Sequence, residues 1–120
     1  MLDLSHGRLH GADRPLDATH LDLSHNDLTE LPAWVGTLGS LVWLDLSHNR
    51  LAALPESLGA LVRLETLDLS HNQLTALPRA IVDLGALSRL ILDDNPFPGI
   101  PEHLPPGVAI IDLTEGRNAW

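Results

Sequence analysis

The feature that most constrains this chain is a hexapeptide that occurs three times without change. The segment Leu-Asp-Leu-Ser-His-Asn begins at Leu21, at Leu44 and at Leu67, so the copies are 23 residues apart. A related segment, Leu-Ile-Leu-Asp-Asp-Asn, begins a further 23 residues on at Leu90. Repetition at a fixed period of this size predicts a solenoid, in which each repeat packs mainly against its two neighbours.

The middle repeat shows how each unit is expected to fold. Leu44 and Leu46 alternate with polar residues, the period-two pattern of a strand that is buried on one side. Asn49 then turns the chain, and Pro55 lies where a short helical turn would begin. The same apolar and proline columns recur in every coil: Leu31, Leu54, Leu77 and Ile100; Pro32, Pro55, Pro78 and Pro101; and Val35, Leu58, Ile81 and Leu104.

The spacing Leu-x-x-Leu-x-Leu-x-x-Asn-x-Leu-x-x-Leu-Pro-x-x-Leu-x-x-Leu holds from about Leu16 to Leu113 and resembles the leucine-rich repeat of the 23-residue type. The resemblance implies an α/β fold, a right-handed solenoid with about five to six parallel strands on its concave face. Short helical, 3-10 or extended segments are expected on the convex face. Nearly all members of this family bind other proteins, so the resemblance also implies an interaction module.

The two ends of the chain depart from the repeat, and we expect a single domain. Residues 1–20 form a shortened N-terminal repeat or cap, with a turn at Asp13-Arg14-Pro15. Full repeats are expected at residues 21–43, 44–66 and 67–89, a terminal repeat at 90–110, and a C-terminal cap and tail at 111–120 that ends in Trp120. We place Ile111 and Leu113 in the strand columns, with Ile111 equivalent to Leu90.

Composition narrows the class of partner. Seven basic against sixteen acidic residues give a formal charge of −9, which repels nucleic acid and anionic membranes and favours a basic or neutral protein. With no tyrosine and one phenylalanine, aromatic side chains are also too few for a surface that stacks bases. No apolar run is long enough to span a membrane. The absence of cysteine excludes disulfides and fits a cytoplasmic protein.

Strand alternation predicts columns of like polar groups on the concave face, about 4.8 Å apart along the array. The columns are Asp22, Asp45 and Asp68, joined by Asp3 and Asp112; Ser5, Ser24, Ser47 and Ser70; and His25, His48 and His71, with His6 before them and Asp94 after. They could form a binding surface of carboxylate and imidazole, or simply a solvated surface.

Two finer roles for the histidine column can be considered. Two histidines and an aspartate could hold a divalent metal, since both are zinc ligands, but such ladders need none and we expect no metal. A pH effect is the more plausible role, because crowded imidazoles cannot all be protonated without repulsion. Partner binding is therefore expected to shift between about pH 5 and 7, where histidine titrates.

Departures from the repeat are the best candidates for specificity. Trp43 precedes Leu44 and should lie on the concave face, where tryptophan often anchors an interface. It could also lie flat over its neighbours. Arg89, Ile91 and Asp94 replace the residues of the earlier repeats on the same face. Trp34 falls on the convex side, where it more plausibly covers the short first repeat than contacts a ligand.

The asparagine column is expected to be structural. It comprises Asn26, Asn49, Asn72 and Asn95. Each amide can bond the backbone of its own turn and of the next coil, satisfying polar groups that the turn would otherwise bury unpaired.

No catalytic constellation is present in the sequence. Serine, histidine and aspartate recur together only because the repeat recurs, without a nucleophile elbow or a phosphate-binding loop. We therefore expect no enzyme activity and no cofactor. The predicted function is protein binding on the concave face. The alternative is a self-associating structural module, a homodimer that pairs through an open terminal strand edge near Leu2 to Ser5.

Overall fold

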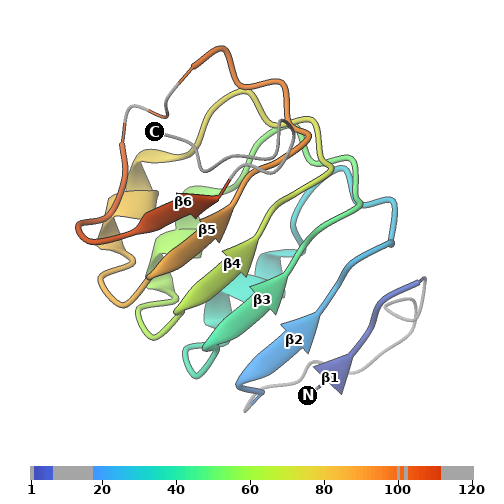
Figure 1. Ribbon diagram of the computed structural model, residues 1–120. Coiled ribbons are helices and arrows are strands. Elements are labelled where there is room, and N and C mark those ends of the chain that lie inside the picture. The colour runs from blue at the N-terminus through green and yellow to red at the C-terminus, as the bar shows by residue number, and fades with distance from the viewer. Residues whose placement is uncertain (1, 7–17, 100, 102, 112–120) are drawn as a thin grey trace.

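The computed structural model describes residues 2–6, 18–99, 101 and 103–111. Within these residues, six parallel strands form one sheet in chain order (Figure 1). Equivalent repeat residues pair directly, as Leu21 pairs with Leu44 and Leu44 with Leu67. The strands are β1 (Leu2–Asp3), β2 (His20–Asp22), β3 (Trp43–Asp45), β4 (Thr66–Asp68), β5 (Arg89–Ile91) and β6 (Ala109–Ile111). The predicted leucine-rich-repeat solenoid, with its parallel sheet on the concave face, is confirmed.

Short 3-10 helices lie behind the sheet, on the convex side (Figure 1). They are η1 (Ala33–Thr37), η2 (Glu56–Ala60) and η3 (Arg79–Asp83). Each begins directly after a proline, whose fixed φ suits the entry to a helical turn and whose missing amide proton is not needed there. The short helical turns predicted at Pro32, Pro55 and Pro78 are therefore present.

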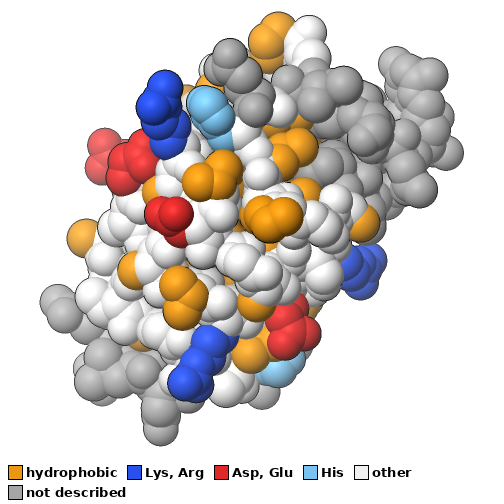
Figure 2. All heavy atoms as spheres, turned by 90° about the vertical axis from the view of Figure 1, so that its left-hand side faces the viewer, with side chains coloured by type: hydrophobic (Ala, Val, Ile, Leu, Met, Phe, Trp, Pro, Cys, Tyr) orange, Lys and Arg blue, Asp and Glu red, His pale blue; other side chains and the backbone are white. Residues whose placement is uncertain are grey.

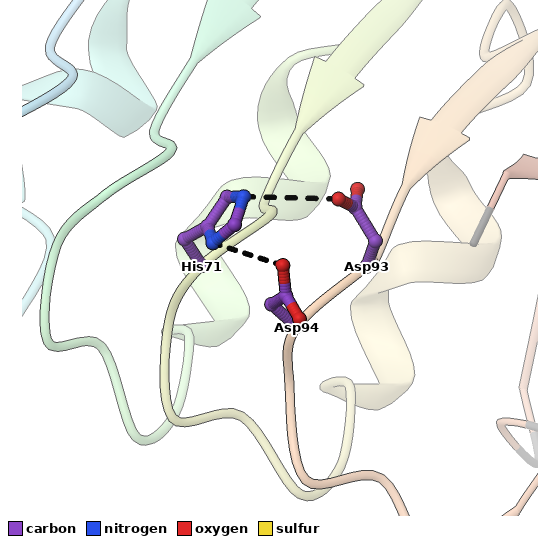
Figure 3. Close-up of side chains that lie close together, drawn as sticks. All are labelled: His71, Asp93 and Asp94. Carbon is purple, nitrogen blue, oxygen red and sulfur yellow. Dashed lines mark ion pairs between the residues drawn. The ribbon is translucent and has the colours of Figure 1, made fainter. Parts of the chain in front are cut away.

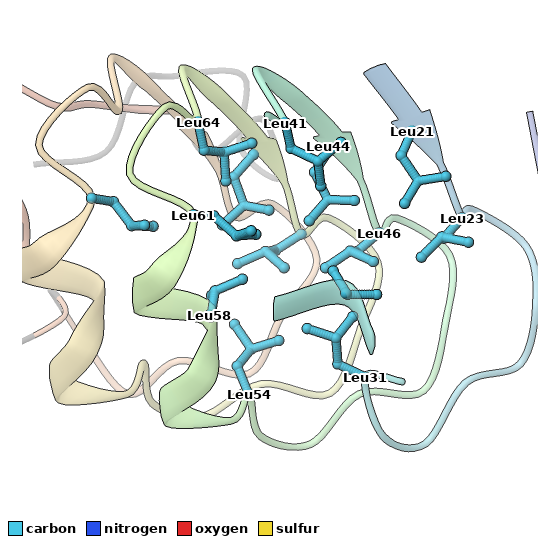
Figure 4. Close-up of a cluster of buried hydrophobic side chains, with 14 of the residues drawn as sticks. Leu21, Leu23, Leu31, Leu41, Leu44, Leu46, Leu54, Leu58, Leu61 and Leu64 are labelled. Carbon is cyan, nitrogen blue, oxygen red and sulfur yellow. The ribbon is translucent and has the colours of Figure 1, made fainter. Parts of the chain in front are cut away.

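The core is a stack of aliphatic side chains between the sheet and the helices (Figure 4). Each of the three coils that carry η1, η2 and η3 buries the leucines on and just after its strand and a residue from the middle of its helix. In the middle coil these are Leu44, Leu46 and Leu58, and all three are fully buried. Since every coil covers its neighbour with the same apolar set, the strands that carry the polar columns are held at a fixed spacing.

The register of the last strand differs from the prediction. We expected Ile111 in the column of Leu90, but Leu90 pairs with Ile110, and Ile111 pairs with Ile91. The sequence offers two adjacent isoleucines, so apolar character alone could not decide which one continues the column. Leu113, Asp112 and Trp120, together with the turn at 13–15, lie outside the described residues.

In the described part of the chain, no helix has the length and apolar character needed to cross a bilayer.

Candidate functional site

The asparagine column binds the backbone of two coils. Asn49 donates from Nδ2 to the carbonyls of Leu46 and Ser47 in its own turn and of Leu23 in the preceding coil. Its Oδ1 accepts the backbone N–H groups of Asn26 and Leu28, also in the preceding coil. The neighbour that the amide joins is therefore the preceding coil, not the next one. Asn26, Asn72 and Asn95 place Nδ2 in the same way.

Trp43 lies in the first exposed column of the concave face. The strand register aligns it with His20 on one side and Thr66 on the other, and Arg89 follows Thr66. The Trp43 indole stacks on the His20 imidazole, with ring centroids 6.3 Å apart. The side chain is half-buried, so an aromatic face is held in place while part of it remains open to solvent.

The aspartate column is fixed by the serine column. Oδ1 of Asp45 accepts the backbone N–H of Ser47 at 2.9 Å and its hydroxyl at 2.6 Å. Asp22 with Ser24, and Asp68 with Ser70, repeat the pattern. The serines are only 5–6% exposed in these three repeats, so the expectation that they line the accessible face is wrong. They orient the carboxylates instead.

The stacked carboxylates affect one another. Burial raises the pKa of Asp45 above its ordinary value; the hydrogen bonds from Ser47 oppose the shift, and the charges of Asp68 and Asp22 add to it. Among the described residues, Oδ2 of Asp22, Asp45 and Asp68 accepts no hydrogen bond from the protein. The column therefore offers a row of carboxylate oxygens to an external donor, and Ile91 ends it at β5.

The histidine column forms a stack of imidazole rings. Successive centroids from His6 through His25 and His48 to His71 are 4.4, 4.2 and 4.1 Å apart, and the planes are within 11° of parallel. All four residues, and Asp94 after them, have a left-handed backbone with φ near +55° to +58°. Histidine and aspartate are among the residues that tolerate this region best. The left-handed backbone was not predicted from the sequence, although the recurrence of one residue type at a fixed place in a tight turn was a clue.

Burial and crowding change the acidity of His48. Burial lowers the pKa of His48 below its ordinary value, and the neighbouring imidazoles of His71 and His25 lower it further. The like-charge repulsion that the sequence led us to expect therefore acts in the structure. The dependence of partner binding on pH stays a prediction.

At the end of the stack, the two ring nitrogens of His71 face the carboxylates of Asp93 and Asp94 (Figure 3). Its Nδ1 is 3.0 Å from Oδ2 of Asp94, and its Nε2 is 3.8 Å from Oδ2 of Asp93. The set expected for a metal was two histidines and an aspartate, whereas the three side chains gathered here are one histidine and two aspartates. Sequence reasoning missed Asp93, which stands in the serine column where the other repeats have no charge.

Elsewhere on the surface of the described residues, no comparable arrangement is found. On the face drawn in Figure 2, apolar side chains lie singly or in small groups between charged and polar ones. The exposed large apolar residues in the described part of the chain are Val62 and Val82. Trp34 is half-buried and packs against the core, so of the two tryptophans in the described residues Trp43 is the one on the concave face.

Comparison with known proteins agrees with this geometry. Two sequence profiles of leucine-rich repeats match the chain, one of two repeat copies at residues 39–102 and one at residues 17–51. A solved leucine-rich-repeat protein of Leptospira interrogans is similar at 48% sequence identity, with a TM-score of 0.63 over 66% of this chain. The chain spans only 20% of that protein's length. No curated protein matches. The matched profile covers more than half of the chain, which therefore belongs to the leucine-rich-repeat family.

Proposed function

We propose that this protein binds a partner protein on its concave face, through Trp43, the aspartate column and the histidine column. The family generally mediates protein–protein interaction, and membership in it indicates an interaction module, not an enzyme. The observation that carries the choice of face is the stacked pair His20 and Trp43 beside a row of oriented carboxylates.

The chemistry of this face defines the class of partner. Tryptophan contributes a large contact area with little loss of side-chain freedom and is enriched at binding hot spots. Oδ1 of each carboxylate is already occupied by serine, so Oδ2 is preorganised toward a donor such as a lysine or arginine of the partner. A basic or neutral surface with an apolar contact for the indole fits both features.

The remaining candidates are at the end of the same face. Arg89 continues the Trp43 column, Ile91 replaces an aspartate, and Asp94 replaces a histidine. At this end of the face a basic, an apolar and an acidic side chain therefore occur together, whereas the earlier coils repeat aspartate and histidine. We assign them to selection among partners, because the uniform columns cannot distinguish one position along the array from another.

Affinity capture tests the proposal. Immobilised wild-type chain is exposed to the native lysate beside two variants, Trp43→Ala and the control Val62→Ala, which trims an exposed side chain outside the columns. We expect a captured protein to be lost with Trp43→Ala and kept with Val62→Ala. Because the interaction is partly electrostatic, raising the salt concentration should also weaken capture. Equal capture by wild type and Trp43→Ala would contradict the proposal.

Self-association is the second candidate. Strand β1 lies at one edge of the sheet and pairs with β2 alone among the described strands. Its described part has two residues, so that part offers few backbone groups to a second copy. Light scattering at high protein concentration separates the two functions. A dimer that Asp3→Pro dissociates would favour self-association, and a strict monomer would remove it.

A further inference from the structure

The hexapeptide of the fourth repeat, which begins at Leu90, differs from the three identical copies at three positions, and these positions lie close together in the chain. Where the third repeat has Asp68, Ser70 and His71, the fourth has Ile91, Asp93 and Asp94. In the third repeat the serine hydroxyl donates to the aspartate two residues before it. In the fourth repeat Ile91 has no acceptor, and Asp93 has no hydroxyl to donate. This hydrogen bond is therefore absent, and a carboxylate occupies the serine position.

The Asp93 carboxylate is buried and incompletely satisfied. The residue is only 8% exposed, and its Oδ1 has no hydrogen-bond partner within the part of the chain that the structure describes. Its Oδ2 faces Nε2 of His71 at 3.8 Å, too far for a hydrogen bond (Figure 3). A buried carboxylate oxygen without a donor is costly, and a hydrogen-bond donor or a metal cation at this atom would remove that cost.

His71 and Asp94 complete a compact donor set around this carboxylate. One ligand atom from each of His71, Asp93 and Asp94 can be chosen so that all three lie within 4.8 Å of one another. Ligand atoms about 2.1 Å from a shared tetrahedral zinc ion lie about 3.4 Å apart. The Nδ1–Oδ2 distance from His71 to Asp94 is already 3.0 Å, so a side-chain rotation of Asp93 would close the set.

We propose that His71, Asp93 and Asp94 bind one divalent transition-metal ion, with zinc as the best fit to the donors. One imidazole nitrogen and two carboxylate oxygens are ordinary zinc ligands, whereas calcium and magnesium favour sites built from oxygen alone. The side chains of His71 and Asp94 are 40% and 45% exposed, so an ion can enter from solvent and keep water as its remaining ligand. A bound ion would satisfy the Asp93 oxygen that has no hydrogen-bond partner within the described residues.

The site has a clear relation to the proposed binding face. It lies at the end of the imidazole stack, and two of its residues directly follow strand β5, which carries Arg89 and Ile91. A bound ion with open coordination positions would change the charge of this end of the face from negative toward neutral. The metal site does not depend on partner binding, and each proposal can fail without the other.

Isothermal titration calorimetry with zinc, on chain that has been stripped of metal with a chelator, tests the site. We expect one zinc ion per chain and weaker binding of magnesium. The variant Asp93→Ser restores the residue of the other repeats and should reduce zinc affinity by at least about tenfold. His71→Asn removes the imidazole but keeps a residue that tolerates the left-handed backbone, and should weaken binding as much.

A matched control separates this site from the rest of the stack. His25→Asn makes the same change at the equivalent turn two coils away and should leave zinc affinity unchanged. Thermal melting without metal verifies that each variant folds, and a given zinc concentration should raise the melting temperature of wild type more than that of Asp93→Ser. Absence of zinc binding by wild type would overturn the proposal. So would equal losses in His25→Asn and His71→Asn, which would place the ion on the imidazole stack.

Discussion

Asn49 illustrates how much of the coil depends on single amide groups. It is 7% exposed, its Nδ2 serves three carbonyls, and its Oδ1 serves two backbone N–H groups. The residue type and its fixed place in the repeat were enough to predict a structural role in the turn. The sequence could not show that the amide bonds the preceding coil and not the next one, because the repeat pattern is the same on both sides of the turn.

Replacing Asn49 with alanine should lower the free energy of unfolding by at least about 2 kcal/mol, since it leaves several buried backbone groups without a partner. Urea denaturation measures the change. Gln73→Ala is the control, because Gln73 is exposed and bonds Leu51 through its backbone, so its effect should stay below about 0.5 kcal/mol. If the two variants unfold at the same urea concentration, the asparagine column does not hold the coils together.

Asp45 gives a prediction that depends on pH. Its pKa is raised in the fold, chiefly by burial, so the folded state disfavours the charged form relative to the unfolded chain. The resulting loss of stability is fully present at neutral pH. It is relieved as the pH falls through the raised pKa toward the ordinary value of 3.8, since the folded state takes up its proton first.

Asp45→Asn keeps the acceptor for Ser47 and removes the charge. We expect it to stabilise the protein at pH 7 by less than about 1 kcal/mol, because solvent screens a partly exposed column. The difference from wild type should shrink at about pH 4, as measured by thermal melting at both values. Glu30→Gln, at an exposed position, corrects for the general loss of one negative charge. A variant that is less stable than wild type at pH 7 would contradict the pKa argument.

Other residue-scale features had no distinct sign in the sequence. The left-handed backbone of His48 depends on how the turn closes, and several residue types would fit the same pattern. The burial of Ser47 and Asp93 follows from the depth of their column below the strand surface, which alternation alone cannot give. The sequence shows that Ile91 and Asp94 depart from the repeat. Only the structure shows that Asp93 and Asp94 lie close to His71.

At the level of elements, the 3-10 helices approach one another through glycine. A Cβ on Gly59 would lie 2.8 Å from Cβ of Ala80 and 2.9 Å from its carbonyl oxygen. Gly36 approaches Ser57 in the same way, with a Cβ to carbonyl distance of 3.0 Å. The helices η1, η2 and η3 can therefore stack at the short spacing that the strands of the sheet impose.

Gly59→Ala should lower the free energy of unfolding by about 1–3 kcal/mol, because the added methyl group meets backbone that cannot move without separating η2 from η3. Denaturant unfolding checks this. Gly85→Ala is the matched control, since a Cβ there meets nothing within 4 Å. It should leave stability unchanged or raise it by about 0.4–1 kcal/mol through the unfolded state. Equal effects at the two glycines would show that the close approach carries no energy.

The elements themselves were largely predictable. Leucine alternation located the strands from β2 to β5, and the prolines located the starts of all the described 3-10 helices. Strand β6 was misaligned by one residue, because Ile110 and Ile111 are both apolar and no asparagine follows within the repeat spacing to fix the phase. The repeat therefore predicts secondary structure well where leucine, proline and asparagine all recur. It predicts the register poorly where only apolar residues remain, as in β6.

In the molecule as a whole, the residues that build the solenoid are different from those that are available to bind a partner. Leucine, proline and asparagine build the coils, while the residues that face outward from the sheet can change from one coil to the next. The chain uses this freedom sparingly: Trp43 in one coil, and Arg89, Ile91, Asp93 and Asp94 together in another. Partner choice is therefore expected to depend on two coils, with the repeated aspartates supplying general attraction for a basic surface.

Mapping of backbone amide chemical shifts during titration with the captured partner tests the concave-face proposal most directly. We expect the largest changes in β2 to β5, centred on Trp43, and little change in η1 to η3. The Trp43→Ala variant should lose about 2 kcal/mol or more of binding free energy if the indole is a hot spot. Shift changes concentrated on the 3-10 helices, with affinity unaffected by Trp43→Ala, would contradict the proposed face.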